Sequence, residues 1–202
     1  AWDKSLIYQG TKVVPFSTAL GTGLSNFEAT SNYQSVQDPA ITVLFKLKDE
    51  EDTYLSAWTT TPWTLPSNLA LCVNDEIDYV KVQDHDNHRF FYIAKERLEA
   101  YGKKRNLEII KELKGRDLKG KKYWPLFDYF KSLETQGAFQ VLSDNYVTTT
   151  DGTGIVHVAP AFGEDDNRVM KEAGMRDVLV CPIDDAGKFT QEVPDFQGQY
   201  VK

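Results

Sequence analysis

Short runs of β-branched, aromatic and aliphatic residues, separated by polar turns, dominate the hydrophobic pattern of this chain. Such runs predict strands, and the Gly-, Asn- and Asp-rich stretches between them predict turns. The predicted strands cover residues 41–47, 54–58, 69–73, 79–82, 89–94, 107–113, 139–142 and 154–158. Short strands with regularly spaced turns are typical of sandwiches and barrels, so the pattern predicts a mainly β fold.

Two segments have the pattern of helices. Residues 95–101 contain helix-forming side chains and are followed by Gly102, a common C-terminal stop. Residues 164–174 begin with acidic side chains, contain Lys171 and end at Gly174, so charges at both ends complement the helix dipole. The sequence therefore predicts a few helices beside a β core.

Composition and charge limit the class of protein. The chain has 202 residues, 30 Asp and Glu against 23 Lys and Arg, and a formal net charge of −7. This length allows one sizeable core or two small domains. The acidic balance argues against a protein that coats nucleic acid. Residues 95–122 differ, with 11 Lys and Arg against 5 Asp and Glu, so this segment is either a phosphate contact or a solvated basic face.

The ends of the chain and its cysteines indicate the compartment. No run of about 18 apolar residues is present, so no membrane span is expected. Residues 1–4 lack the apolar core of a signal peptide and an initiator Met, which favours a processed chain or a fragment. Cys72 and Cys181 cannot supply a disulfide framework, so we expect a reduced, cytoplasmic protein.

Three short motifs resemble known sites but lack what the chemistry needs. Residues 115–122 nearly match the phosphate-binding GxxxxGK[ST] loop, yet Lys122 replaces the magnesium-binding hydroxyl and no helix pattern follows. His85 and His88 lie on a polar turn and offer too few ligands for a metal. Residues 151–154 form a glycine turn without the helix of a dinucleotide loop. These motifs therefore predict turns.

The most unusual segment is WTTTPWTLPSN, residues 58–68. Proline cannot donate to a strand ladder, so pairing should end near Pro62, and side chains at a strand end often project into sites. The hydroxyls of Thr59, Thr60 and Thr61 could line a small pocket that binds and sterically selects a ligand. Threonine is also a common strand residue, so a purely structural role is the alternative.

A second segment, GTGIVHVAPAFGEDD, covers residues 152–166. His157 lies in a predicted apolar strand, and Asp165 and Asp166 open the predicted helix that follows. A histidine before a sharp loop could face a cleft, and a carboxylate there could pair with a substrate ammonium. A satisfied core histidine and ordinary acids at a helix start are the structural alternative.

Together the two segments resemble the editing domain, also called connective polypeptide 1 or CP1, of isoleucyl-tRNA synthetase. The resemblance covers essentially the whole chain and includes YQGTKVVPFST at residues 8–18 and LSNFE at residues 24–28, which are similar to the eukaryotic cytosolic type. Gly23 stands where that pattern has Pro. The sequence TPWT at residues 61–64 differs from the Arg-Pro-acidic pattern of the leucyl and valyl enzymes.

The resemblance implies a single editing domain, residues 1–202, excised from a larger synthetase. It implies a β-barrel core with a few peripheral α-helices and post-transfer hydrolysis of mischarged Val-tRNA(Ile), with Ile-tRNA(Ile) excluded sterically. The HIGH and KMSKS signatures of the synthetic site are absent, so this chain should not activate an amino acid. Editing should need no cofactor and no metal, and ATP should serve only the full-length enzyme.

The implied partners are the 3′ end of aminoacylated tRNA(Ile) and the remainder of the synthetase chain, with no membrane. The isolated domain should be a cytoplasmic monomer. A non-catalytic RNA-binding or interaction module on a β-barrel is the alternative, in which the threonines and Asp166 are only structural.

The resemblance also assigns roles to residues. Asp166 should bind the α-ammonium of the substrate, and His157 should line the acyl pocket, a role favoured over that of a general base. Thr60 and Thr61 should contact the acyl group and the attacking water. The substrate-binding residues should be Thr59, Trp63, Thr64 and Asn68, of which Asn68 holds the terminal adenosine or supports the threonine loop.

Overall fold

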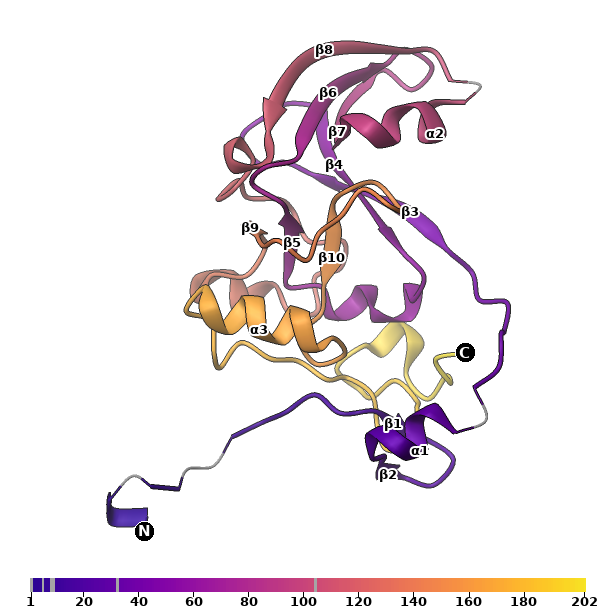
Figure 1. Cartoon of the computed structure of the whole chain (residues 1–202), viewed down its shortest axis with the longest axis vertical. Coiled ribbons are helices and arrows are strands. Elements are labelled where there is room, and N and C mark those ends of the chain that lie inside the picture. The colour runs from indigo at the N-terminus through magenta and orange to yellow at the C-terminus, as the bar shows by residue number, and fades with distance from the viewer. Residues whose placement is uncertain (1, 5, 8–9, 32, 104) are drawn as a thin grey trace.

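The structure is a computed structural model that describes residues 2–4, 6–7, 10–31, 33–103 and 105–202 (Figure 1). Tyr8 and Gln9, which open the sequence resemblance, lie outside the described residues. The strands are β1 Phe16–Ser17, β2 Thr22–Gly23, β3 Ile41–Lys46, β4 Thr53–Thr59, β5 Ala70–Val73, β6 Asp78–Asp84, β7 Arg89–Ala94, β8 Leu107–Lys114, β9 Gln140–Ser143 and β10 Val156–Val158.

The helices are short. The α-helices are α1 Asn26–Thr30, α2 Leu98–Gly102 and α3 Glu164–Glu172. The 3₁₀ helices are η1 Trp2–Lys4, η2 Pro62–Ser67, η3 Lys95–Arg97, η4 Gly115–Asp117, η5 Lys131–Gln136 and η6 Pro194–Phe196. All eight predicted strands and both predicted helical segments are confirmed, with ends that differ by a few residues. The pattern missed β1, β2 and α1, although Ser25 and Glu28 form a capping box at the start of α1.

The main sheet has the order β8-β6-β7-β4-β10-β5-β9, and β3 pairs antiparallel with β4. Two isolated bridges close part of this sheet into a barrel, because Leu47 pairs with Tyr123 and Lys122 pairs with Gln140. Residues 121–124 therefore join the end of β3 to β9. The predicted β-barrel core is confirmed, and it is built from β3, β4, β10, β5, β9 and this connecting segment.

Large apolar side chains fill the barrel. Phe45, Leu55, Leu71 and Tyr123 are each fully buried, and the rings of Phe45 and Tyr123 meet edge to face at 5.3 Å. Burial of such side chains stabilises the fold by about 1.5–3 kcal/mol each. The barrel is thus a packed core, and a ligand must bind at its rim.

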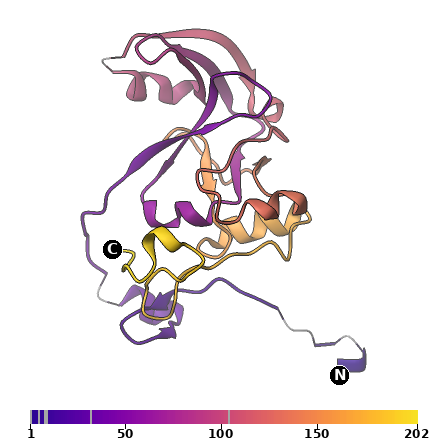
Figure 2. The same ribbon diagram turned by 180° about the vertical axis from the view of Figure 1, so that it is seen from behind.

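Two further parts flank the barrel (Figures 1 and 2). Strands β6, β7 and β8 continue the sheet away from the barrel, and α2 packs there against a second small core that includes Val80 and Phe91. At the opposite end, β1, β2 and α1 lie beside the C-terminal segment, where Thr18 and Tyr200 share a hydrogen bond of 3.2 Å. No helix in the described part of the chain has the length and hydropathy of a bilayer span.

Candidate functional site

Two segments far apart in the sequence meet at one end of the barrel and enclose a pocket of about 330 Å³. Strands β4 and β10 run parallel, so the segments that follow them leave the sheet at the same edge. The first wall comes from β4, the following turn and η2: Trp58, Thr59, Thr60, Thr61 and Thr64. The second comes from β10, the next loop and α3: Val156, His157, Ala159, Phe162, Gly163 and Asp166.

The threonine wall forms because β4 stops just before a proline. Pro62 occupies the first turn of η2, where a missing N–H costs little. The hydroxyl of Thr59 accepts a hydrogen bond from the Thr61 amide at 3.0 Å, and the Thr64 hydroxyl donates to the Thr61 carbonyl at 2.8 Å. Thr59 and Thr64 are buried, whereas Thr60 and Thr61 are exposed in the pocket. Two threonines therefore fix the turn, and the other two are exposed at the wall of the pocket.

His157 is held from both sides by neutral groups. Its Nε2 lies 2.9 Å from the Thr64 hydroxyl, and its Nδ1 lies 2.8 Å from the side-chain amide nitrogen of Asn68. An amide nitrogen can only donate, so this network assigns the proton to Nε2. Burial lowers the pKa of His157 to about 4, since the charged form loses its hydration. His157 is therefore a neutral wall of the pocket with both ring nitrogens engaged.

Asn68 and Trp63, both predicted to bind substrate, lie outside this pocket. Asn68 is 5% exposed and sits behind His157, where its amide also donates to the Ala70 carbonyl at 2.8 Å and accepts from the Tyr123 hydroxyl at 2.7 Å. This position fits a supporting role and leaves no amide hydrogen for a nucleotide. Trp63 lines a neighbouring pocket of about 270 Å³ that shares Thr60 with the first.

Asp166 is the carboxylate of the pocket. It is the third residue of α3, and its Oδ2 accepts a hydrogen bond from the Ala159 amide at 2.9 Å. Burial raises the pKa of Asp166 above its ordinary value, while the Ala159 amide opposes that shift. A Cβ on Gly163 would lie 2.8 Å from Asp166 Cγ, so only glycine leaves the carboxylate its place. A cation in the pocket would relieve this buried charge.

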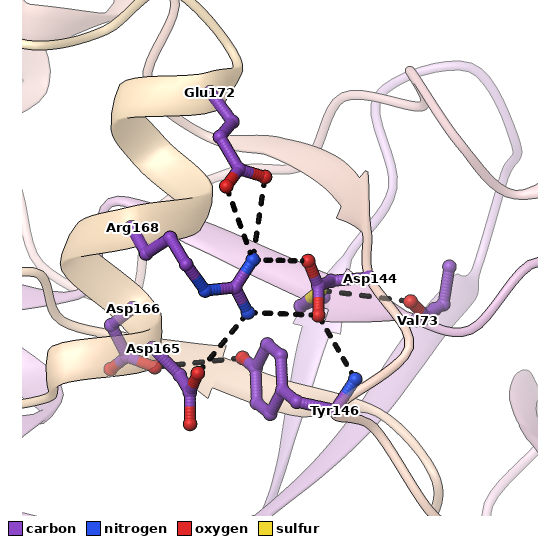
Figure 3. Close-up of polar contacts among 8 residues, drawn as sticks. Val73, Asp144, Tyr146, Asp165, Asp166, Arg168 and Glu172 are labelled. Carbon is purple, nitrogen blue, oxygen red and sulfur yellow. Dashed lines mark hydrogen bonds and ion pairs between the residues drawn. The ribbon is translucent and has the colours of Figure 1, made fainter.

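Asp165, the other acid singled out in the sequence, points elsewhere. It is exposed and pairs with Arg168 at 3.1 Å (Figure 3). The structure thus brings together Asp166, His157 and the threonines at 59, 60, 61 and 64. Sequence reasoning missed the roles of Phe162 and Gly163 as lining residues, although a glycine directly before acidic helix residues was a usable signal.

No group of three or more His, Cys, Asp or Glu side chains within the described ranges could hold a metal ion. His85 instead contacts Glu108 at 3.0 Å on the surface. The glycine turn at residues 115–120 leads into the bridge at Lys122 and not into a helix, as its sequence predicted.

Known proteins are similar to this chain over almost its whole length. No protein-family model matches the chain. It is 55% identical over 205 residues to the cytoplasmic isoleucine–tRNA ligase of Mus musculus, covering 100% of this chain and 16% of the relative. It is 51% identical to the cytoplasmic isoleucine–tRNA ligase of Saccharomyces cerevisiae, covering 99% of this chain and 19% of the relative.

Two solved structures share the fold. The GlLeuRS-CP1 crystal structure aligns with a TM-score of 0.55 and 16% identity, covering 72% of this chain and 70% of that one. The editing domain of P. knowlesi cytosolic leucyl-tRNA synthetase aligns with a TM-score of 0.54 and 14% identity, covering 69% and 64%.

The architecture is that of the CP1 editing domains of class I aminoacyl-tRNA synthetases. Within that class, the chain is homologous over its whole length to an internal region of isoleucyl-tRNA synthetase. It spans less than a fifth of the length of these curated relatives, at 16% and 19%.

Proposed function

We propose that this chain is a single editing domain whose pocket hydrolyses the ester of mischarged Val-tRNA(Ile) and sterically excludes Ile-tRNA(Ile). One observation carries the proposal: Asp166 and His157 line the same pocket as Thr60 and Thr61, so a carboxylate, an imidazole ring and two exposed threonines surround one small hollow. A purely structural role for these residues does not explain why they surround a hollow.

Asp166 binds the α-ammonium of the aminoacyl group. Carboxylate–ammonium contacts are among the stronger polar contacts, and they fix the ester in register with the reacting water. The half-buried position of Asp166 strengthens the contact, since its charge is poorly solvated in the free protein.

Water is the nucleophile, and Thr60 and Thr61 hold the acyl group and that water. Within the described residues, the Thr60 hydroxyl has no hydrogen-bond partner, so it is free to donate to or accept from a ligand. Editing then needs neither a covalent intermediate nor a cofactor, and donors at the pocket wall stabilise the developing oxyanion.

Selection depends on the size of the acyl pocket. It is known for this family that one methylene contributes only about 1–3 kcal/mol to selection, which is why a second, hydrolytic sieve is used. His157 suits such a sieve, because bonds to Thr64 and Asn68 prevent its ring from turning aside for a larger side chain. Crowding a stiff wall costs a similar energy, about 1–3 kcal/mol.

The partners follow from charge. Four cations of the basic segment 95–122 already pair with acids of this chain: Lys95 with Glu112, Lys114 with Asp78, Arg116 with Glu76, and Lys121 with Asp49 and Glu50. Paired cations contribute little to phosphate binding and the whole chain has a net charge of −7, so we infer that this domain alone binds tRNA weakly. We therefore assign it the single-stranded 3′ end, while the remainder of a full-length synthetase holds the tRNA body and uses ATP.

The test is hydrolysis of Val-tRNA(Ile) and Ile-tRNA(Ile) by this chain and by two neighbouring variants. Asp166→Ala should abolish hydrolysis of the valyl ester, whereas Asp165→Ala, which removes an exposed acid one residue away, should retain it. Hydrolysis that survives Asp166→Ala contradicts the assignment. An inactive wild-type chain that still binds tRNA ends favours the non-catalytic RNA-binding module.

A further inference from the structure

Tyr146 lies beside Asp166 but outside the lining of the pocket. It belongs to the loop that follows β9, and its hydroxyl oxygen is 3.5 Å from Asp166 Oδ1 (Figure 3). The ring is half-buried, and Tyr146 does not line the pocket. Neither the sequence motifs nor the pocket wall identifies this residue, so its contact with Asp166 calls for a separate explanation.

An ion pair holds the loop of Tyr146 against the helix of Asp166. Asp144 accepts two hydrogen bonds from the Arg168 guanidinium, at 2.8 Å and 3.0 Å, and Arg168 follows Asp166 by two residues on α3. Asp144 also accepts from the Tyr146 amide at 2.9 Å. Bidentate arginine–carboxylate pairs restrict both distance and angle. The position of Tyr146 relative to Asp166 is therefore fixed by its own loop.

We propose that Tyr146 is a positioning residue for Asp166, which keeps that carboxylate ionised and turned toward the substrate ammonium; the catalytic half of this inference depends on the proposed deacylation. The Ala159 amide donates to Oδ2 at 2.9 Å, and the Tyr146 hydroxyl makes a longer contact of 3.5 Å with Oδ1, so rotation of the carboxylate breaks both contacts. Each oxygen retains a second lone pair for the ammonium.

The phenol acts here as a donor. Burial, the neighbouring Cys72 thiol and the charge of Asp166 raise the pKa of Tyr146 above its ordinary value, so its hydroxyl keeps its proton at neutral pH. A hydrogen bond donated to a carboxylate favours the charged form, which offsets part of the burial that opposes ionisation of Asp166. Loss of the hydroxyl should therefore make Asp166 harder to ionise.

The experiment compares this chain with Tyr146→Phe, which deletes the hydroxyl and keeps the ring. The pKa of Asp166 is read from its side-chain ¹³Cγ signal, and kcat/KM for Val-tRNA(Ile) is measured across pH. We expect the pKa of Asp166 to rise by at least ~0.5 in the variant, since a donor to the charged form is lost. The acidic limb of the kcat/KM profile should move to higher pH by the same amount, which lowers kcat/KM about threefold at a fixed pH on that limb. The plateau value of kcat/KM should stay within about twofold of wild type.

Tyr129→Phe is the matched control, because it removes another tyrosine–carboxylate bond, to Asp195 at 2.5 Å, outside the pocket. It should leave both readings unchanged. An Asp166 pKa that is the same in wild type and Tyr146→Phe overturns the inference, whatever the rates. If the pKa of Asp166 rises in Tyr146→Phe but neither chain hydrolyses Val-tRNA(Ile), the positioning role of Tyr146 is supported and only the proposed deacylation is contradicted.

Discussion

The side-chain amide of Asn68 donates to Nδ1 of His157 at 2.8 Å, which leaves the imidazole proton on Nε2, directed at Thr64. The oxygen of the same Asn68 side chain accepts a hydrogen bond from the buried Tyr123 hydroxyl at 2.7 Å. Tyr123 belongs to the segment that closes the barrel, so the orientation of the pocket histidine is set by the barrel itself. A residue outside the pocket lining thus decides which ring nitrogen of His157 carries the proton.

Asn68→Ala should destabilise the fold and loosen the sieve. It leaves Tyr123 without its acceptor and His157 without its donor, and each unsatisfied buried group costs about 1–3 kcal/mol. Unfolding in urea should show a loss of about 2–4 kcal/mol, and hydrolysis of Ile-tRNA(Ile) relative to Val-tRNA(Ile) should rise. Asn106→Ala, at an exposed position, should stay within about 0.5 kcal/mol of wild type. An Asn68→Ala chain as stable as that control contradicts the network.

The stability of the domain should depend on pH through His157. Its folded pKa, about 4, lies below the ordinary value of 6.5, so the unfolded chain takes up a proton first as the pH falls. The stabilisation is complete above pH 6.5 and is lost progressively towards pH 4, by on the order of 3 kcal/mol. Urea unfolding across this pH range should show that the free energy of unfolding falls less steeply for His157→Gln than for wild type. Equal losses in both chains contradict a buried neutral histidine.

The raised pKa of Asp166 makes the stability of the fold depend on pH in the opposite direction. A carboxyl with a folded pKa above its unfolded one stabilises the protonated fold, and this contribution disappears as the pH rises through the folded value. Ionised Asp166 therefore costs stability at neutral pH, where the proposed deacylation requires the carboxylate. Asp166→Asn should unfold within about 1 kcal/mol of wild type, or be more stable, yet lose deacylation by at least about 100-fold. A strongly destabilised variant would indicate a structural carboxylate.

Gly163→Ala tests the position of the Asp166 carboxylate while the carboxylate itself is retained. The backbone of Gly163 is extended, with φ −127°, so alanine is tolerated by the chain, but its Cβ would crowd Asp166 Cγ. We expect deacylation to fall by about 10-fold or more with little change in thermal unfolding, because a displacement of about 1 Å is costly for catalysis. Gly23→Ala, where a Cβ meets nothing closer than 3.5 Å, is the control and should change neither.

The β pattern of this chain was readable because its strands are short, β-branched and bounded by polar turns. The eight strands of the barrel and its extension were all predicted, since alternation and turn signals agree there. The closure of the barrel was not predictable, because it depends on single bridges at Leu47 and Lys122 that no local pattern marks. Long-range pairing of this kind appears only in three dimensions.

The candidate site divides in the same way. The threonines and Asp166 were identified from two unusual segments, and the pocket contains them. The residues that support them were not identified from the sequence. Tyr146 contacts Asp166 across a sequence separation of 20 residues, and Tyr123 contacts Asn68 across 55. Sequence patterns identify residues that line the pocket, whereas the groups that hold those residues in place come from distant loops.

A crystal structure of this chain with a non-hydrolysable amide analogue of valyl-adenosine would show directly whether Asp166 binds the ammonium of an aminoacyl group. The ammonium should lie within about 3 Å of an Asp166 oxygen, and the isopropyl group should lie between His157 and the exposed threonines. An ammonium bound away from Asp166, or an acyl group seated in the neighbouring pocket at Trp63, would contradict the proposed function.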